Sequence, residues 1–144
     1  MKVNTYLNYG GNCREALAFY EKELGGKINM LMTHGEAPGG SNLGPEMKDS
    51  VMYASLTLGD TTVMASDVPA ERFQPMRSVY LCLGVDSDAE AERVYELLSE
   101  GGQIYMPMQE TFFASRFGQL RDRFGTSWMI IHEKRMAPPQ GGSQ

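Results

Sequence analysis

The segment 108–131, MQETFFASRFGQLRDRFGTSWMII, concentrates charged and aromatic side chains that could do chemistry. Glu110 stands between a glutamine and a threonine that is followed by two phenylalanines. A carboxylate that is partly buried has a raised pKa and can serve as a general base at neutral pH. The alternative is a structural carboxylate that is hydrogen-bonded to the backbone or to an arginine. Glu110 is therefore the candidate catalytic residue, with a structural role left open.

The same segment carries three arginines, Arg116, Arg121 and Arg123. Guanidinium groups can hold a carboxylate or a phosphonate through paired hydrogen bonds. On a hairpin they can equally pair with Glu and Asp across strands. Five aromatic residues complete the segment, and we expect them to pack between helix and sheet or across a dimer interface: Phe112, Phe113, Phe117, Phe124 and Trp128.

The elements that position these residues are first visible near the N-terminus. Residues 3–9 alternate in polarity, which is typical of a strand. Asn12 then precedes an amphipathic run and Glu15 follows three residues later, which predicts a capping box at the start of a helix. Gly25-Gly26 predicts its end, and residues 27–33 predict a second strand.

The same plan recurs about 75 residues later. Residues 78–85 alternate as a strand, and Ser87 with Glu90 forms a second predicted capping box. Gly101-Gly102 ends the second helix. Each half then closes with a hairpin, the first turning at Gly59-Asp60 and the second within 122–125.

This repeat predicts an α+β fold of two βαβββ modules. Module one spans about 1–68 and module two about 77–135, within a single domain at 1–135. The segment 136–144 is rich in Pro, Gly and Ser, and we expect it to be disordered. The loop 35–50 is Gly- and Pro-rich and could be either a lid or a flexible connection.

Strand alternation places Tyr6 and Tyr80 on the strand faces that do not meet the helices, at places that we expect to be equivalent in the two modules. These faces could line a cavity in a cupped sheet or simply face water, and the tyrosines could contact a ligand or pack in the core. Asp67 ends a strand before Pro69, where it could contact a ligand or cap a turn. His34 is expected at the surface.

Composition narrows the function. The chain has 144 residues, 42% of them hydrophobic, and a formal net charge of −5. The negative charge argues against nucleic acid as a partner. No apolar run is long enough for a membrane helix, and the first residues do not resemble a secretion signal. Two cysteines without a CxxC spacing suggest free thiols and a cytoplasmic protein.

Three stretches together resemble PhnB-like (YjdN-type) proteins of the vicinal oxygen chelate superfamily, which includes glyoxalase I, extradiol dioxygenases and bleomycin-resistance proteins. They are YLNYGGNCREALAFYEKELGGKI, VMASD at 63–67, and the segment quoted first, with its Gln-Glu-Thr-Phe, Asp-x-Phe-Gly and Trp-Met signature. The resemblance covers about residues 3–134. It implies cupped mixed sheets with helices packed outside, as in the glyoxalase/bleomycin resistance/dihydroxybiphenyl dioxygenase fold, and a homodimer.

Enzymes of this superfamily hold a divalent cation with His and Glu, one from each of four strands. Alignment on the helix and turn motifs puts Asn4, Ala65, Tyr80 and Met129 at those positions, and none is His or Glu. This departure from the superfamily's pattern predicts no metal and no cofactor. His132 falls on the strand face opposite Met129. The residues expected to bind a ligand are Asn4, Tyr6, Asp67, Tyr80, Phe112 and Met129.

Three functions fit the sequence, and it does not decide whether the chain is an enzyme. The first is a protein that binds a small molecule without a metal. The second is a glyoxalase-like lyase or isomerase, or a dioxygenase-related enzyme, that uses Glu110 as acid or base. The third is a structural or assembly partner without a ligand. The identity of the ligand is not predicted.

Overall fold

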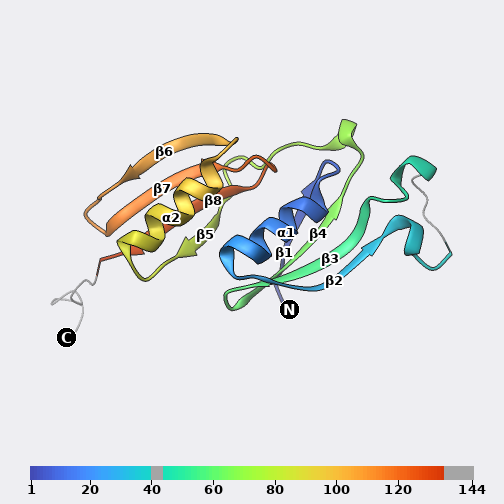
Figure 1. The fold of residues 1–144 in the computed structure, drawn as a ribbon, viewed down its shortest axis with the longest axis horizontal. Helices are drawn as coiled ribbons and strands as arrows, with labels where there is room; N and C mark the ends of the chain where they lie inside the picture. Colours follow the sequence, from blue (N-terminus) through green and yellow to red (C-terminus); the bar gives the residue numbers. More distant parts are fainter. Residues whose placement is uncertain (40–43, 135–144) are drawn as a thin grey trace. The chain divides into compact units, whose positions relative to one another are not determined.

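The computed structural model describes residues 1–39 and 44–134. The chain divides into two compact units, Met1–Pro75 and Met76–Gln144. Each unit contains a strand, a helix and three further strands in that order, as the repeat predicted (Figure 1). The α+β class is confirmed, while a single domain over 1–135 stays a prediction.

Unit one forms a four-stranded mixed sheet in the order β1-β4-β3-β2. β1 runs parallel to β4, and the other neighbours are antiparallel. The elements are β1 (Thr5–Tyr9), α1 (Cys13–Leu24), β2 (Lys27–Thr33), β3 (Val51–Leu58) and β4 (Thr61–Asp67).

Unit two repeats this topology in the order β5-β8-β7-β6, with β5 parallel to β8. The first strand of each unit is shorter than predicted, so Asn4 and Tyr80 lie just before their strands. The elements are β5 (Leu81–Gly84), α2 (Asp88–Ser99), β6 (Gln103–Gln109), β7 (Ala114–Arg121) and β8 (Ser127–Glu133).

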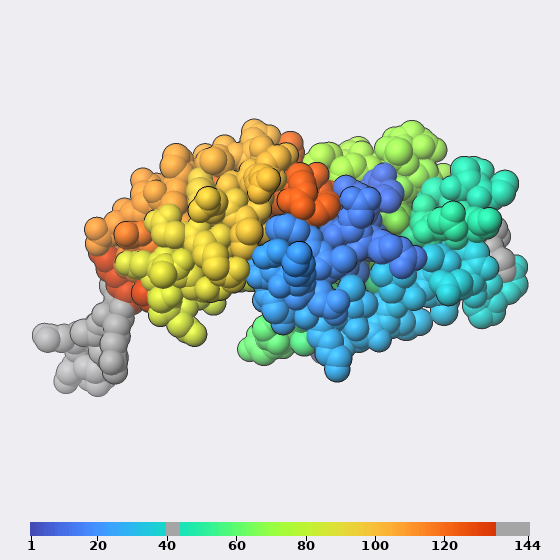
Figure 2. All heavy atoms as spheres, viewed as in Figure 1, coloured from blue at the N-terminus to red at the C-terminus, as the bar shows by residue number. Residues whose placement is uncertain are grey.

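Each helix covers one face of the sheet in its own unit. α1 packs mainly on β3, and α2 packs mainly on β7 (Figure 1). The helices bury apolar side chains such as Leu17 and Leu98, both fully inaccessible, and each such side chain contributes about 1.5–3 kcal/mol. The glycine stops are confirmed, because Gly25 and Gly101 adopt left-handed φ values of 73°. In Figure 2 the outer side of α2 (yellow) continues into β6 (orange).

The start of α1 differs from the prediction. Asn12 makes no side-chain cap bond, so the expected capping box is wrong. Asp67 at the end of β4 takes over this role: its Oδ1 accepts hydrogen bonds from the backbone N–H groups of Gly11 and Cys13, both at 3.0 Å. Its Oδ2 accepts from the N–H of Val51 at 2.9 Å. This carboxylate, only 5% exposed, ties α1, β3 and β4 together.

The start of α2 is closer to the prediction. The Ser87 hydroxyl accepts a hydrogen bond from the Glu90 N–H at 3.0 Å, as a cap should. The Glu90 carboxylate binds Arg93 at 2.6 Å, one turn further along the helix. A serine and a distant aspartate thus provide helix caps at equivalent places in the two units.

Strand register identifies the residue of unit two that corresponds to Asp67. In unit one Met64 pairs with Ser55 and Tyr6. In unit two Met129 takes the same place, between Gln119 and Cys82. Counting three residues along the last strand from each methionine leads to Asp67 and to His132.

His132 makes contacts that correspond to those of Asp67. Its Nδ1 lies 2.8 Å from Asp88 Oδ1, at the first residue of α2, and 2.8 Å from the Ser115 hydroxyl on β7. Ser115 also donates to Asp88 Oδ1 at 2.6 Å. We call the contacts of Asp67 and of His132 the two clamps, because each ties a helix start to two strands of its sheet.

The last hairpin turns as predicted. The Gly125 N–H donates to the carbonyl of Asp122 at 3.1 Å. Asp122 Oδ1 accepts from the N–H groups of Phe124 and Thr126, and Oδ2 accepts from the indole N–H of Trp128 at 2.8 Å. Trp128 is fully buried. This turn therefore fixes the largest core side chain of unit two.

The loop 35–50 is described in part, since 40–43 lie outside the described residues. Its two ends are joined by backbone bonds from the His34 N–H to Ser50 and from the Gly35 N–H to Lys48. His34 is buried at 7% exposure, so its expected surface position is wrong. The lid stays a prediction, and the tail 136–144 also lies outside the described residues.

The Asp67 clamp gives a stability prediction. Asp67→Asn removes the charge that three N–H groups share and turns an amide NH₂ toward one of them. We expect a loss of about 2–3 kcal/mol in the free energy of unfolding of unit one. Amide exchange at Gly11, Cys13 and Val51 should accelerate. Asp60→Asn, in an exposed turn, is the control, and equal effects of the two substitutions would contradict the role of the clamp.

The second clamp gives a pH dependence. Hydrogen bonds from Ser115 and then His132 hold the pKa of Asp88 below its ordinary value of 3.8. Ionised Asp88 therefore stabilises the fold above that value, and this contribution is lost as the pH falls through the lower folded pKa. In urea unfolding, the difference in stability between wild type and Asp88→Asn should begin to shrink below about pH 4 and vanish only below the lowered folded pKa. Ser115→Ala should reduce the difference at neutral pH, and a constant difference at every pH would refute this account.

Candidate functional site

In each unit the sheet face opposite the helix carries side chains of an unusual kind. We call this the distal face. In unit one its central row runs across all four strands, through Tyr6, Met64, Ser55 and Met30. None of these residues is charged, although Tyr6 is 48% exposed and Met30 42% exposed. A sheet face that meets bulk water usually carries charged or strongly polar side chains.

The distal face of unit two has an equivalent row. Cys82, Met129, Gln119 and Met106 lie side by side on β5, β8, β7 and β6. Both rows therefore read as Met, a polar side chain and Met on the three antiparallel strands. The register also corrects one expectation: the counterpart of Tyr6 is Cys82 and not Tyr80.

Two tyrosines from opposite edges of the sheet of unit two contact each other. β5 and β6 are its two edges, separated by three strand spacings, or about 14 Å in a flat sheet. Yet the rings of Tyr80, next to β5, and Tyr105, on β6, meet edge to face with centroids 6.2 Å apart. The two side chains therefore reach toward each other from opposite edges of the sheet, and the expected cupping stays a prediction.

Arg77 joins the two tyrosines. Its guanidinium carbon lies 4.1 Å from the centroid of the Tyr105 ring, and its Nη1 donates to the Tyr80 hydroxyl at 3.2 Å. The Tyr105 hydroxyl is shielded from solvent and has no hydrogen-bond partner among the described residues. Leaving such a group unpaired costs about 1–3 kcal/mol. We call Arg77, Tyr80 and Tyr105 the Arg–Tyr cluster.

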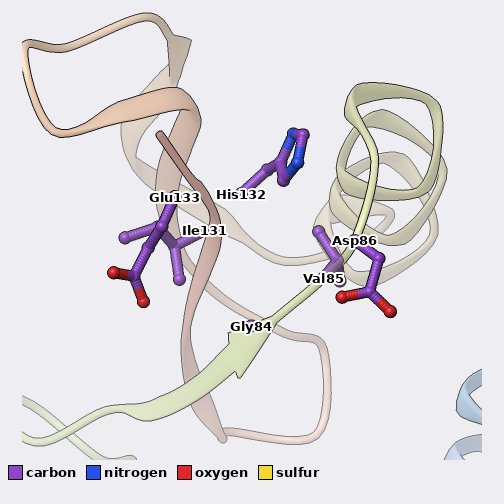
Figure 3. A pocket seen from close by; sticks show the side chains of 6 residues that line it. All are labelled: Gly84, Val85, Asp86, Ile131, His132 and Glu133. Atoms are coloured by element: carbon purple, nitrogen blue, oxygen red, sulfur yellow. The ribbon is translucent and has the colours of Figure 1, made fainter. Parts of the chain in front are cut away.

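A hollow of about 410 Å³ lies elsewhere in unit two, where β5 and β8 end (Figure 3). Figure 3 shows that the carboxylates of Asp86 and Glu133 point in different directions, while the His132 ring turns toward α2. The lining side chains therefore do not converge on one point. The residues around the hollow are Gly84, Val85, Asp86, Ile131, His132 and Glu133.

The neighbouring Ser115, His132 and Asp88 do not form a catalytic triad. In a triad the serine and the carboxylate bind opposite nitrogens of the imidazole. Here both lie 2.8 Å from the same atom, Nδ1, so the ring cannot relay a proton between them. The equivalent position in unit one holds the Asp67 clamp, which supports a structural role for these residues.

Glu110 does not have the surroundings that the sequence suggested. Its side chain is 64% exposed and its carboxylate lies 2.8 Å from Lys134 Nζ. The hydrogen bond and the charge of Lys134 hold the pKa of Glu110 below its ordinary value. The expected burial and raised pKa are therefore wrong, and the arrangement supports the structural alternative, a pair between the β6–β7 connection and the end of β8.

The other residues that were predicted to bind a ligand do not lie together in one site. Met129 is half-buried on the distal face, and Tyr6 is exposed there. Asn4 is exposed before β1. Asp67 faces α1 and both of its oxygens are engaged, as expected of a structural cap. Phe112 is 81% exposed in the β6–β7 connection.

One of the four positions that were aligned with the superfamily's metal ligands has to be changed. Ala65 pairs with Leu7 and Ala54 and is fully buried beneath α1, so its alignment with Met129 is wrong. The position equivalent to Met129 is Met64. Within 1–39 and 44–134, no group of three His, Cys, Asp or Glu residues converges as metal ligands would.

The three arginines of the last hairpin have different partners, and Arg116 pairs with acidic residues that lie on α2 and not across the strands. Arg116 pairs with Glu92 at 3.0 Å and lies 3.8 Å from Asp88. Arg121 donates to Gln103 across the strands at 3.1 Å. Arg123 lies at the turn, over the ring of Phe124.

The aromatic residues divide between core and surface. Phe124 and Trp128 are buried in the core, and Phe117 is buried on the distal side of β7, where it pairs with Ile131. Phe113 contacts both Phe112 and Phe117 with centroids 5.2 Å apart.

Sequence reasoning missed Arg77, Cys82, Tyr105 and Gln119. Cys82 and Gln119 could have been found, because their alternation with Leu81 and Leu120 puts them on the face opposite the helix. Tyr105 lies within a register irregularity of β6, which simple alternation does not anticipate. Arg77 precedes the strand, so no periodic signal covers it.

Comparisons with known proteins agree with this architecture. The chain is 30% identical over 138 residues to Protein YjdN of Escherichia coli (strain K12). This alignment covers 90% of this chain and 94% of that protein. It is 38% identical to protein PA1353 from Pseudomonas aeruginosa, with a TM-score of 0.82 over 94% of this chain and 99% of the other. A Bacillus cereus structure titled as a putative 3-demethylubiquinone-9 3-methyltransferase, PhnB protein, is 25% identical, with a TM-score of 0.78 over 92% and 99%.

A more distant structure shows the fold alone. The glyoxylase/bleomycin resistance protein/dioxygenase domain from Frankia sp. EAN1pec has a TM-score of 0.60 at 17% identity, covering 93% of this chain and 98% of its own. In the described part of the chain no helix has the length and apolar character needed to span a bilayer. The family model described as 3-demethylubiquinone-9 3-methyltransferase matches residues 1–131, and the chain belongs to this family of PhnB-like proteins.

Proposed function

We propose that the chain binds a small molecule on the distal faces of its sheets. The observation that carries this proposal is the repeated row of Met, a polar residue and Met in both units. Methionine side chains are flexible and polarizable, so they adapt to apolar ligands of varied shape. Ser55 and Gln119, at the middle of the rows, can give the ligand a hydrogen bond.

The proposal includes a site without a resident metal. The two aligned positions on the last strand of each unit, Met64 and Met129, offer thioether sulfur, which suits soft ions and not the hard divalent cations that prefer oxygen and nitrogen. The family's description as a methyltransferase is not the basis of the proposal, because no Gly-rich loop follows a strand in a Rossmann pattern. We further propose a cytoplasmic homodimer.

The cysteine thiols offer a direct test, because Cys82 belongs to the distal row and Cys13 does not. Cys82 is exposed, although partial desolvation and then Glu133 raise the pKa of its thiol. Cys13 is buried, and burial raises the pKa of its thiol to about 12. Iodoacetamide at mildly alkaline pH should therefore label Cys82 alone in the folded protein.

We expect benzyl alcohol, as a neutral aromatic probe, to slow the labelling of Cys82 in a saturable way, measured by mass spectrometry of the intact protein. Met129→Ala should weaken this protection, because it removes the neighbouring apolar surface. Leu97→Ala, on the outer layer at α2, is the matched control. Labelling that stays equally fast at all probe concentrations would refute binding at this face.

The catalytic alternative predicts a role for Glu110 that its contacts do not favour. Glu110→Gln breaks an exposed ion pair, and such pairs contribute little to stability. We expect an unchanged melting temperature and unchanged protection of Cys82 by the probe. A clear loss of protection with an unchanged melt would revive Glu110 as a residue of the site.

A further inference from the structure

We propose that the Arg–Tyr cluster is an anion-binding subsite, which takes the carboxylate or phosphonate group of a ligand whose apolar part lies along the Met129 row. This inference rests on the proposed function, since it places one end of the ligand on the distal face of unit two. It adds the charge of the ligand, which the methionine rows alone do not specify.

The first argument is the fixed position of the Arg77 guanidinium. The Tyr105 ring lies 4.1 Å below it, and the Tyr80 hydroxyl accepts one of its N–H groups at 3.2 Å. A guanidinium has five N–H donors in a rigid fork that matches a carboxylate or a phosphonate. Stacking on an aromatic ring holds the fork in place while its edge stays free for an anion.

Arg77 also lacks an acidic partner among residues 1–39 and 44–134. It forms no ion pair with any described residue, whereas Arg93 binds Glu90 and Arg116 binds Glu92. The Arg77 side chain is exposed and lies against the Tyr105 ring, so it can be reached by an anion from solution. An external anion would supply the partner that Asp and Glu supply elsewhere.

The second argument is the Tyr105 hydroxyl. It is shielded from solvent and lacks a hydrogen-bond partner among the residues that the structure describes. Buried polar groups are rarely left unpaired, and those that are tend to lie at sites with a further partner. A phosphonate held by Arg77 has three oxygens, enough to engage the guanidinium and accept a bond from this hydroxyl.

The backbone between the members of the cluster is also unusual. Ser78 adopts a φ of 66°, the one left-handed residue other than glycine in the described chain. This conformation is unfavourable for a residue with a side chain, and such strain concentrates at binding sites. Here the chain bends at Ser78, between Arg77 and Tyr80, whose side chains both contact Tyr105.

Phenylphosphonate and benzyl alcohol distinguish this subsite from the proposed function as a whole. Both probes carry a phenyl ring, but only phenylphosphonate is an anion. We expect both to slow iodoacetamide labelling of Cys82, and phenylphosphonate to do so at a concentration at least about tenfold lower, because it gains charge-assisted hydrogen bonds. Amide shifts of Arg77, Tyr80 and Tyr105 in NMR spectra should saturate with phenylphosphonate only.

Single substitutions test whether the preference for phenylphosphonate arises at the Arg–Tyr cluster. Arg77→Gln should weaken the binding of phenylphosphonate by about tenfold or more and leave the binding of benzyl alcohol unchanged. Arg123→Gln is the control. It removes the same charge from a guanidinium that also stacks on a ring, but at the hairpin turn, and it should change the binding of neither probe. Tyr105→Phe should weaken the binding of phenylphosphonate without lowering the melting temperature, because the hydroxyl bonds to no described residue.

The possible results distinguish a failure of the anion subsite from a failure of the proposed function. Protection by benzyl alcohol without preference for phenylphosphonate would overturn the anion subsite and leave the proposed function standing. Protection by neither probe would overturn both. Equal effects of Arg77→Gln and Arg123→Gln on phenylphosphonate would reduce the effect to general electrostatics and overturn the subsite.

Discussion

One helix can cover only one face of a four-stranded sheet, and the rest of each unit depends on this constraint. A helix about 10 Å wide spans roughly two strand spacings, so α1 and α2 each bury a single apolar face. The side chains on the opposite face do not have to pack against a helix. They are free to carry Met, Tyr, Ser and Gln, and the residues that could hold a ligand gather there. The core and the candidate site are therefore two sides of the same strands.

Polar contacts tie the start of each helix to its sheet. Asp67 and His132 occupy the same register position, yet one offers two acceptor oxygens to backbone N–H groups and the other offers a ring nitrogen to side chains. The same geometric need is met by different chemistry in the two halves. This comparison between the halves is also what identifies the group of Ser115, His132 and Asp88 as architecture, although its residue types suggest catalysis.

Local signals in the sequence were sufficient for the repeat, the helices, the glycine stops and both hairpins, because each depends on residues a few positions apart. Long-range contacts were not predictable in this way. Asp67 replaces Asn12 as the cap from more than fifty residues away. Glu110 finds Lys134 at the far end of the last hairpin, which reverses the expected change in its pKa. A slip of one position in aligning the two halves put buried Ala65 where Met64 belongs, since alternation makes every such slip a change of face.

The methionine rows also make the two sheets sensitive to oxidants. Peroxide converts an accessible thioether to a sulfoxide, which is polar and chiral and no longer suits apolar surfaces. Met30, with 42% of its surface exposed, would react before the buried core methionine Met47. Oxidation would then turn a soft, adaptable face into a hydrated one while the helix-covered core stays intact. The thioethers that we propose to contact a ligand are thus also the groups on which an oxidant would act first.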